Sequence, residues 1–126
     1  MFIGAHLLLS STNAEADRRF FADVLGFRSV DAGGGWLIFK LPPAEAALHP
    51  ADARAVHPHA GHELAAAVLY LMCENREATI ATLRSRGVRC SEIERERWGI
   101  RTTIPLPSGA ELGLYQPTHP TALELA

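Results

Sequence analysis

Residues 20–27, FFADVLGF, decide how this chain folds. Together with Ala16, the apolar residues of this stretch recur at helical spacing and predict an amphipathic helix. Gly26 predicts where the helix ends, because glycine readily takes the left-handed conformation of a C′ residue. Thr12, followed three residues later by Glu15, has the pattern of a capping box and predicts the helix start.

Strand-like segments flank this helix on both sides. An apolar run, 6–9, precedes it and predicts a strand. Two short strands, 27–31 and 36–39, follow and are joined by a turn at Gly33-Gly34-Gly35. A last strand is predicted from Glu45 to His49, where Pro50 ends it.

The second half of the chain repeats the same order of elements. A strand is predicted at 68–71. The helix that follows begins after Asn75 and ends at Gly87, and its Ile80 and Leu83 are expected to face the core of the protein. Three predicted strands follow, at 88–97, 100–104 and 111–115. Each half therefore contains a strand, a helix and three strands, which indicates an internal duplication.

The duplication divides the chain into two modules, 1–50 and 64–117, within a single domain over 1–117. The stretch 51–63 is rich in Ala, His and Pro and is expected to be a linker. Residues 118–126 are expected to form a loosely held tail.

The overall composition excludes several classes of protein. The 126 residues are 48% hydrophobic and 21% charged, which is typical of one globular domain and not of a disordered chain. A net charge of −2 without a Lys/Arg-rich run argues against nucleic acid as a partner. We expect no membrane partner, since no apolar run is long enough to span a bilayer. No targeting signal is evident, and Cys73 and Cys90 are expected to be reduced, so we expect a cytoplasmic protein.

The duplicated order and residues 20–27, with Trp98-Gly99 and the stretch 107–112, resemble the vicinal oxygen chelate superfamily. This group contains glyoxalase I, bleomycin-resistance proteins and extradiol dioxygenases. The resemblance covers about residues 3–117. It implies an α+β fold in which tandem βαβββ modules form a curled mixed sheet around a cleft, with the helices on the outer face. It also implies a homodimer and, in metal-using members, a divalent metal held in the cleft by His, Gln or Glu.

The metal-ligand positions that the resemblance implies are mostly blank here. His6 matches the first ligand position. The other three positions hold Val68 (or its neighbour Ala67), Ala47 and Gly113, which offer no donor side chain. A metal site of this kind needs about three protein ligands. We therefore expect no bound metal, and a cofactor is either absent or a divalent metal held elsewhere.

A shifted metal site is the alternative. Glu45 and Glu111 lie two residues upstream of the blank positions and on the same strand face, so that with His6 they offer one nitrogen and two carboxylates. This set suits iron or manganese. The two-residue shift moves each carboxylate by roughly 6–7 Å along its strand. Such a site would make the protein a metal-dependent lyase, isomerase or extradiol-type dioxygenase.

Strand alternation directs a second set of side chains into the cleft. His49 and Tyr115 occupy equivalent positions in the two modules, and Tyr70 is expected to point the same way. Rings with polar tips suit a small-molecule pocket. The full set of candidate ligand-binding residues is His6, Glu45, His49, Tyr70, Glu111 and Tyr115. We expect a protein that binds a small molecule in the inter-module cleft. Acid–base catalysis by His6 or His49 with a nearby glutamate is a further option, and whether the protein is an enzyme stays open.

Two further features have ordinary structural explanations. Trp98 is expected to pack across a hairpin, although it can also offer a stacking surface. The run His57-Pro58-His59-Ala60-Gly61-His62 can capture Zn or Ni ions loosely, but it is expected to be a solvated loop. The chain carries no GxSxG, Walker or GxGxxG-before-helix pattern.

Overall fold

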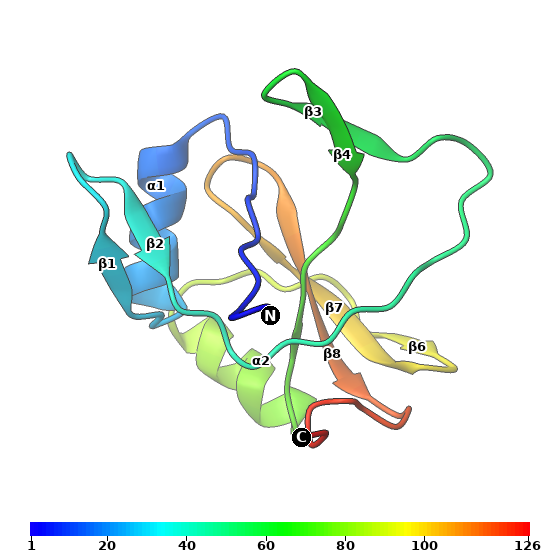
Figure 1. The fold of residues 1–126 in the computed structure, drawn as a ribbon. Coiled ribbons are helices and arrows are strands. Elements are labelled where there is room, and N and C mark those ends of the chain that lie inside the picture. The colour runs from blue at the N-terminus through cyan, green and yellow to red at the C-terminus, as the bar shows by residue number, and fades with distance from the viewer. The chain divides into compact units, whose positions relative to one another are not determined.

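The computed structural model describes residues 1–126, which divide into two compact units. The first unit contains Met1–Lys40 and Pro105–Glu111, and the second contains Leu41–Ile104 and Leu112–Ala126. Figure 1 shows the helices and strands in chain order. None of the helices has the length and apolar content needed to cross a membrane. The predicted module boundaries, 1–50 and 64–117, stay a prediction.

The helix of the first unit forms where residues 20–27 predict it. It comprises α1 (Ala14–Arg19) and continues as a π-helical turn, η1 (Phe20–Val24). Gly26 then takes a φ of 75°, and the Phe27 N–H donates to the Phe21 carbonyl at 3.0 Å. The predicted C′ glycine is therefore confirmed, because this conformation closes the last turn of the helix.

The start of this helix differs from the prediction by one residue. Asn13 is the N-cap, and its side chain accepts a hydrogen bond from the Ala16 N–H at 3.3 Å. The predicted capping box of Thr12 with Glu15 is wrong. The Thr12 hydroxyl instead donates to the carbonyl of Ser108 at 3.3 Å, a partner that no local pattern could indicate.

A small apolar core joins the helix to a hairpin in the first unit. The predicted turn at the three glycines separates β1 (Ser29–Asp31) from β2 (Leu37–Phe39), which pair antiparallel. The buried ring of Phe21 contacts Phe27 and Phe39, with ring centroids 5.8 and 5.4 Å apart. Residues 20–27 thus supply the centre of this core as well as the helix end.

Asp17 fastens the segment 105–111 to α1. Its buried carboxylate accepts hydrogen bonds from the Ser108 hydroxyl at 2.6 Å, the Ser108 N–H at 3.0 Å and the Ser11 hydroxyl at 2.7 Å. Burial raises the pKa of Asp17, but the bonds from Ser108 and Ser11 together outweigh it and hold the pKa below the ordinary value of 3.8. The charged carboxylate is therefore the form that the fold stabilises.

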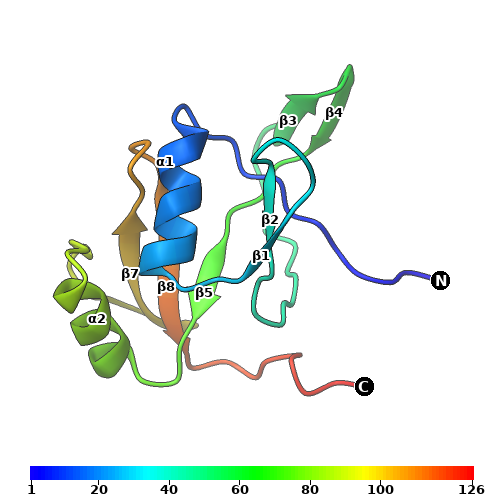
Figure 2. The same cartoon turned by 90° about the vertical axis from the view of Figure 1, so that its left-hand side faces the viewer.

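The second unit is built on a four-stranded mixed sheet. Its strands and helix, in chain order, are β5 (Tyr70–Met72), α2 (Arg76–Ser85), β6 (Glu94–Glu96), β7 (Gly99–Pro105) and β8 (Glu111–Pro117). The spatial order is β5-β8-β7-β6, with β5 parallel to β8 and β6 antiparallel to β7. Figure 2 shows β5 and β8 running side by side in the same direction. The strand–helix–three-strand order predicted for this half is confirmed.

Both ends of α2 follow the sequence signals. The Asn75 side chain accepts from the Ala78 N–H at 3.1 Å and caps the helix, as predicted. Gly87 has a φ of 83°, and the Val88 N–H donates to the Leu83 carbonyl at 3.0 Å. These two terminal signals are local, so they act independently of the rest of the fold.

The core of the second unit lies on one face of its sheet. The buried side chains that form it alternate along β7 and β8 and recur on and just after α2. They are Ile80, Leu83, Val88, Thr102, Ile104, Leu112 and Leu114. Because neighbouring residues of a strand point to opposite faces, the residues between them belong to the other face of the sheet.

Three predicted strands are corrected. Residues 6–9 and 45–49 form no strand, and the run 88–97 forms only the short β6. A strand exists only where a neighbour completes its hydrogen bonds. Residues 6–9 and 45–49 belong to none of the sheets, and outside β6 the run 88–97 has a single backbone bond to β7, from the Ser91 N–H to the Thr103 carbonyl at 3.3 Å. Conversely, part of the predicted linker loop 51–63 forms an antiparallel hairpin of β3 (Val56–His59) and β4 (His62–Ala65).

The role of Asp17 gives a first prediction. We expect Asp17→Asn to lower the free energy of unfolding by about 2 kcal/mol at pH 7, because hydrogen bonds to a charged group contribute about 1.5–3 kcal/mol each and an amide replaces them only in part. Since the folded state lowers the pKa of Asp17, this contribution is present above about pH 4 and is lost as the pH falls through the folded-state pKa.

Urea unfolding of both proteins between pH 2 and pH 7 measures this effect. Asp23→Asn is the matched control, because Asp23 is exposed on the same helical segment. A difference between the wild type and Asp17→Asn that persists unchanged at pH 2 would contradict the assignment of the effect to the carboxylate.

Candidate ligand-binding face

The face of the second unit's sheet opposite its core carries the aromatic residues predicted for the cleft. On β8, Gly113 and Tyr115 alternate with the buried Leu112 and Leu114. Tyr70 of β5 pairs directly with Gly113, and directly paired residues point to the same side of a sheet. We call this side the open face.

Two glycines make room for rings on the open face. A Cβ at Gly113 would collide with the ring of Tyr70, which lies across the backbone there. A Cβ at Gly99 would come within 2.6 Å of the Tyr115 ring and 2.8 Å of the Gln116 carbonyl oxygen. The rings of Tyr70 and Tyr115 therefore rest on backbone, where any larger residue would displace them.

Tyr70, Trp98 and Tyr115 form a compact aromatic cluster. Their ring centroids lie 5.3 to 5.6 Å apart, and each pair meets edge to face. Tyr115 is 8% exposed, whereas Tyr70 and Trp98 are each 38% exposed. Tyr115 is thus the base of the cluster, and the other two rings present apolar surface outward. Trp98, expected to pack across its hairpin, packs instead on the rings of Tyr70 and Tyr115 from β5 and β8, and it keeps part of its ring accessible.

The C-terminal tail secures the base of the aromatic cluster. The His119 ring stacks on Tyr115 at 5.8 Å between centroids, and the Tyr115 hydroxyl lies 2.9 Å from His119 Nε2. His119 Nδ1 lies 2.7 Å from the Pro120 carbonyl, which can only accept, so Nδ1 carries the proton and Nε2 accepts from the tyrosine. The tail, predicted to be loosely held, is fastened here.

Burial raises the pKa of Tyr115, and the nearby Glu45 carboxylate and the Tyr70 hydroxyl raise it further. The phenol is therefore neutral at physiological pH and donates its proton to the His119 hydrogen bond. Glu45 is also held in place, since its Oε1 accepts from the Ala122 N–H at 2.7 Å.

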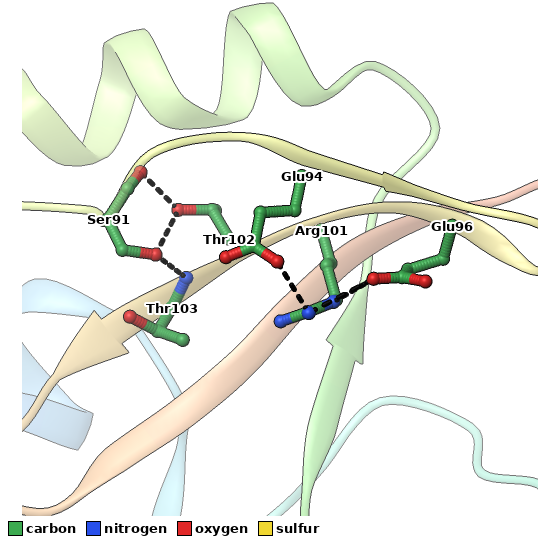
Figure 3. Close-up of polar contacts among 6 residues, drawn as sticks. All are labelled: Ser91, Glu94, Glu96, Arg101, Thr102 and Thr103. Atoms are coloured by element: carbon green, nitrogen blue, oxygen red, sulfur yellow. Dashed lines mark hydrogen bonds and ion pairs between the residues drawn. The ribbon is translucent and has the colours of Figure 1, made fainter.

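An ion-paired arginine shares the open face. Arg101 donates to Glu94 at 2.7 Å and to Glu96 at 3.1 Å, and the hydrogen bond to Glu96 is the main cause that raises the pKa of Arg101. Figure 3 shows the Arg101 side chain directed away from α2, opposite to that of Thr102. One guanidinium thus faces two carboxylates, and the group carries a net negative charge.

A hydroxyl chain holds β7 in position beside the segment that leads into β6. The Thr103 N–H donates to the Ser91 hydroxyl at 2.9 Å, and the buried Thr102 hydroxyl donates to the Ser91 carbonyl at 2.7 Å (Figure 3). The two hydroxyls lie 3.1 Å apart, and the Ser91 hydroxyl donates to Thr102, whose proton is already used. Thr102 is the neighbour of Arg101 on β7, and its side chain points to the core. This network gives its buried hydroxyl hydrogen-bond partners.

The structure brings some of the predicted site residues together. Tyr70 and Tyr115 meet in the aromatic cluster, and Glu45 lies close enough to Tyr115 to influence its pKa. His49 is exposed, and its Nδ1 lies 2.7 Å from the Pro50 carbonyl. The predicted role of His49 as a cleft residue equivalent to Tyr115 stays a prediction.

His6 and Glu111 belong to the first unit, and both are exposed there. Their convergence with Glu45 on one metal ion stays a prediction. No group of three or more His, Cys, Asp or Glu side chains is arranged to hold a metal ion in the structure.

The residues at the positions implied for the usual metal site do not fit a metal. Gly113, at one of these positions, lies beneath the Tyr70 ring, so no side chain could extend from it without displacing that ring. Val68 and Ala47 offer no donor atoms. His6 alone has a suitable side chain, and one imidazole does not make such a site.

Arg101, Glu94, Glu96 and His119 were missed by sequence reasoning. Alternation from the core residue Thr102 places Arg101 on the open face, and this signal was present in the sequence. The contact between Tyr115 and His119 depends on how the tail turns back, which no spacing rule indicates.

Comparison with known proteins places this geometry in context. The sequence model described as "Glyoxalase/Bleomycin resistance protein/Dioxygenase superfamily" matches residues 4–114. The comparison with curated proteins gives no match.

Several solved structures share the fold. TnmS3, an antibiotic binding protein from Streptomyces sp. CB03234, is 21% identical with a TM-score of 0.62, covering 94% of this chain and 99% of that one. A glyoxalase/bleomycin resistance protein from the same Streptomyces is 20% identical with a TM-score of 0.54, covering 84% and 93%. Lactoylglutathione lyase from Agrobacterium tumefaciens is 15% identical with a TM-score of 0.57, covering 86% and 88%. At these identities the likeness concerns the fold alone.

The packing of Tyr70 on Gly113 gives a second prediction. We expect Gly113→Ala to lower the free energy of unfolding by about 1–3 kcal/mol, because the new methyl group forces the ring off the sheet. Urea unfolding measures the loss, and near-UV circular dichroism reports the displaced aromatic cluster.

Gly4→Ala is the control, since a Cβ at Gly4 meets nothing within 4 Å. In a Tyr70→Ala background the same Gly113→Ala change should be nearly neutral, as a double-mutant cycle would show. An equal loss in both backgrounds would mean that the ring is not the group that Gly113 accommodates.

Proposed function

The chain belongs to the glyoxalase/bleomycin resistance protein/dioxygenase superfamily, and on that premise we propose that it binds a small molecule against the aromatic cluster of its open face. The observation that carries the proposal is the cluster itself. Two half-exposed rings, Tyr70 and Trp98, rest on a buried third ring that glycines and the tail hold in place. The antibiotic-binding description of TnmS3, which shares the fold, agrees with this kind of role.

The cluster suits a planar, largely apolar ligand. Its rings are fixed by packing before any ligand arrives, so binding orders little that was mobile. Stacking or edge-to-face contact with an aromatic ring contributes about 0.5–1.5 kcal/mol beyond the apolar area that it buries. Two accessible rings therefore give both affinity and a preferred orientation.

The charges around the cluster favour neutral or cationic ligands. Arg101 is neutralised by Glu94 and Glu96, and Glu45 adds a carboxylate close to Tyr115. An anionic ligand would meet more negative than positive charge on this face, whereas a cation would be attracted to the carboxylates and to the ring faces.

We propose that binding proceeds without the family's usual complete metal site. The collision that any side chain at Gly113 would make with Tyr70 supports this, as does the lack of donor atoms at Ala47 and Val68. A metal-dependent lyase, isomerase or dioxygenase that uses His6 with Glu45 or Glu111 is the alternative, and metal titration distinguishes the two.

We further propose a cytoplasmic homodimer. Both cysteines are free, which suits a reducing compartment. Large apolar side chains are exposed along the N-terminal segment, and a second copy of the chain is a suitable cover for them. They are Phe2, Ile3, Leu7, Leu8 and Leu9.

Ligand binding is tested with three tricyclic probes of similar ring area. These are cationic 9-aminoacridine, neutral acridone and anionic anthracene-9-carboxylate. We expect the first two to raise the melting temperature and the third to have little effect. Tyr70→Ala and Trp98→Ala should each weaken binding about tenfold, which corresponds to roughly 1.4 kcal/mol of lost ring contact. Isothermal titration calorimetry measures the dissociation constants.

Trp36→Ala is the matched control, because Trp36 is the other tryptophan, is 54% exposed and lies in the first unit. Equal losses in Trp36→Ala and Trp98→Ala would refute the proposed face. If Fe²⁺ or Mn²⁺ raises the melting temperature and His6→Gln or Glu45→Gln abolishes that effect, the metal-enzyme alternative replaces the metal-free proposal.

The homodimer is tested by light scattering coupled to size-exclusion chromatography. We expect the wild type to elute with twice the mass of the chain and Leu8→Glu to shift it towards the monomer, because a charge disfavours burial of this segment. Leu125→Glu, at an exposed position of the tail, should leave the dimer intact. A monomeric wild type at high concentration would exclude the dimer.

A further inference from the structure

The β3–β4 hairpin gathers three histidines on one side. In its register His59 lies directly opposite His62, and His57 lies opposite Leu64. His57 and His59 are two residues apart on β3, so their side chains share a face, and direct cross-strand partners share that face too. His57, His59 and His62 therefore project from the same side, which we call the histidine face.

The hydrogen bonding of the hairpin supports this register. The Ala66 N–H donates to the Ala55 carbonyl at 3.1 Å, which marks that pair as hydrogen-bonded. Bonded and non-bonded pairs alternate along an antiparallel ladder, so the pair of His59 with His62 is bonded and Pro58 falls at a non-bonded position. Proline, which has no N–H, fits there without loss of a ladder bond.

The turn holds the two central histidines opposite each other. Ala60 and Gly61 both have positive φ values, 50° and 79°, as a two-residue type I′ loop requires. Two residues leave no slack between His59 and His62. The alanine is a poor choice for this conformation, which disfavours a side chain by about 1–2 kcal/mol.

The spacing on the histidine face matches the reach of imidazole groups around one ion. Directly opposite residues have Cβ atoms about 4.5–5.5 Å apart, and a diagonal neighbour is about 7–8 Å away. Metal–nitrogen bonds of about 2.0–2.1 Å then allow three imidazoles on such positions to converge. The side chains as they stand hold no such arrangement. All three residues are exposed, so their side chains have room to rotate towards one another at the surface.

The chemistry of the face selects a class of metal. No carboxylate shares it, because Glu63 pairs with Pro58 on the opposite side and forms an ion pair with Arg54. Imidazole nitrogens suit Cu²⁺, Ni²⁺, Co²⁺ and Zn²⁺, whereas Mg²⁺ and Ca²⁺ require oxygen ligands. We propose that His57, His59 and His62 form a surface site for one borderline divalent transition metal ion. The site shares no residue with the open face and does not depend on the proposed function.

Metal titration of the untagged full-length chain tests the site. Isothermal titration calorimetry should give one ion per chain, with affinity rising from Co²⁺ to Ni²⁺ to Cu²⁺ and no heat from Mg²⁺. His57→Ala, His59→Ala and His62→Ala should each weaken Ni²⁺ binding by at least about tenfold, since changes merely around metal ligands already have effects of that size. Electron paramagnetic resonance of the Cu²⁺ form should show coupling to imidazole nitrogens.

A face-swapped variant tests the register itself. His62→Gln combined with Glu63→His keeps three histidines in the hairpin but moves one to the opposite side. It should bind Ni²⁺ as weakly as His62→Ala. His49→Gln and His6→Gln are controls outside the hairpin and should bind like the wild type, with thermal unfolding confirming that every variant is folded.

Three results would overturn the proposal. The first is no saturable binding of Cu²⁺ or Ni²⁺ by the wild type. The second is undiminished binding by the face-swapped variant, which would mean that the shared face is irrelevant. The third is loss of binding in His6→Gln but not in His59→Ala, which would assign the ion to another site.

Discussion

The contact between the Tyr70 ring and the bare backbone at Gly113 is the constraint on which the open face depends. With no side chain at Gly113, the ring lies down on the sheet and reaches Tyr115 and Trp98. Gly99 does the same for Tyr115. Two glycines in neighbouring strands therefore let the rings of the aromatic cluster lie against one side of the sheet. At either position a residue with a side chain would hold the rings apart.

The same contact decides what chemistry this face supports. A donor side chain at Gly113 and a ring that covers Gly113 exclude each other, because both need the same space. The aromatic cluster therefore takes the place of a metal ligand at Gly113, and the two cannot be present together. Arg101 with its two glutamates then sets the charge beside the aromatic cluster, so that side chains on neighbouring strands, and not the fold, give this face its chemical character.

How much the sequence predicts depends on how local each signal is. Gly26, Gly87 and the Asn75 cap act within a few residues, and all three were predicted correctly. The cap at Thr12 failed because Ser108, far along the chain, takes its hydroxyl. The strands at 6–9 and 45–49 failed for a related reason: apolar or alternating composition favours a strand, but only a hydrogen-bonded neighbour creates one.

The candidate site follows the same logic. Alternation along β8 was sufficient to separate Tyr115 from the core leucines, and it applied equally to Arg101 beside Thr102, where it was not used. It could not reveal that His119 turns back onto Tyr115, since that contact depends on the path of the tail. The histidine run shows the opposite case. Its three histidines are evident in the sequence, but whether their side chains share a face depends on the register of the hairpin. A shift of one residue between β3 and β4 would divide the three imidazoles between two faces. Side-chain identity names a possible chemistry, and backbone pairing determines whether the groups can act together.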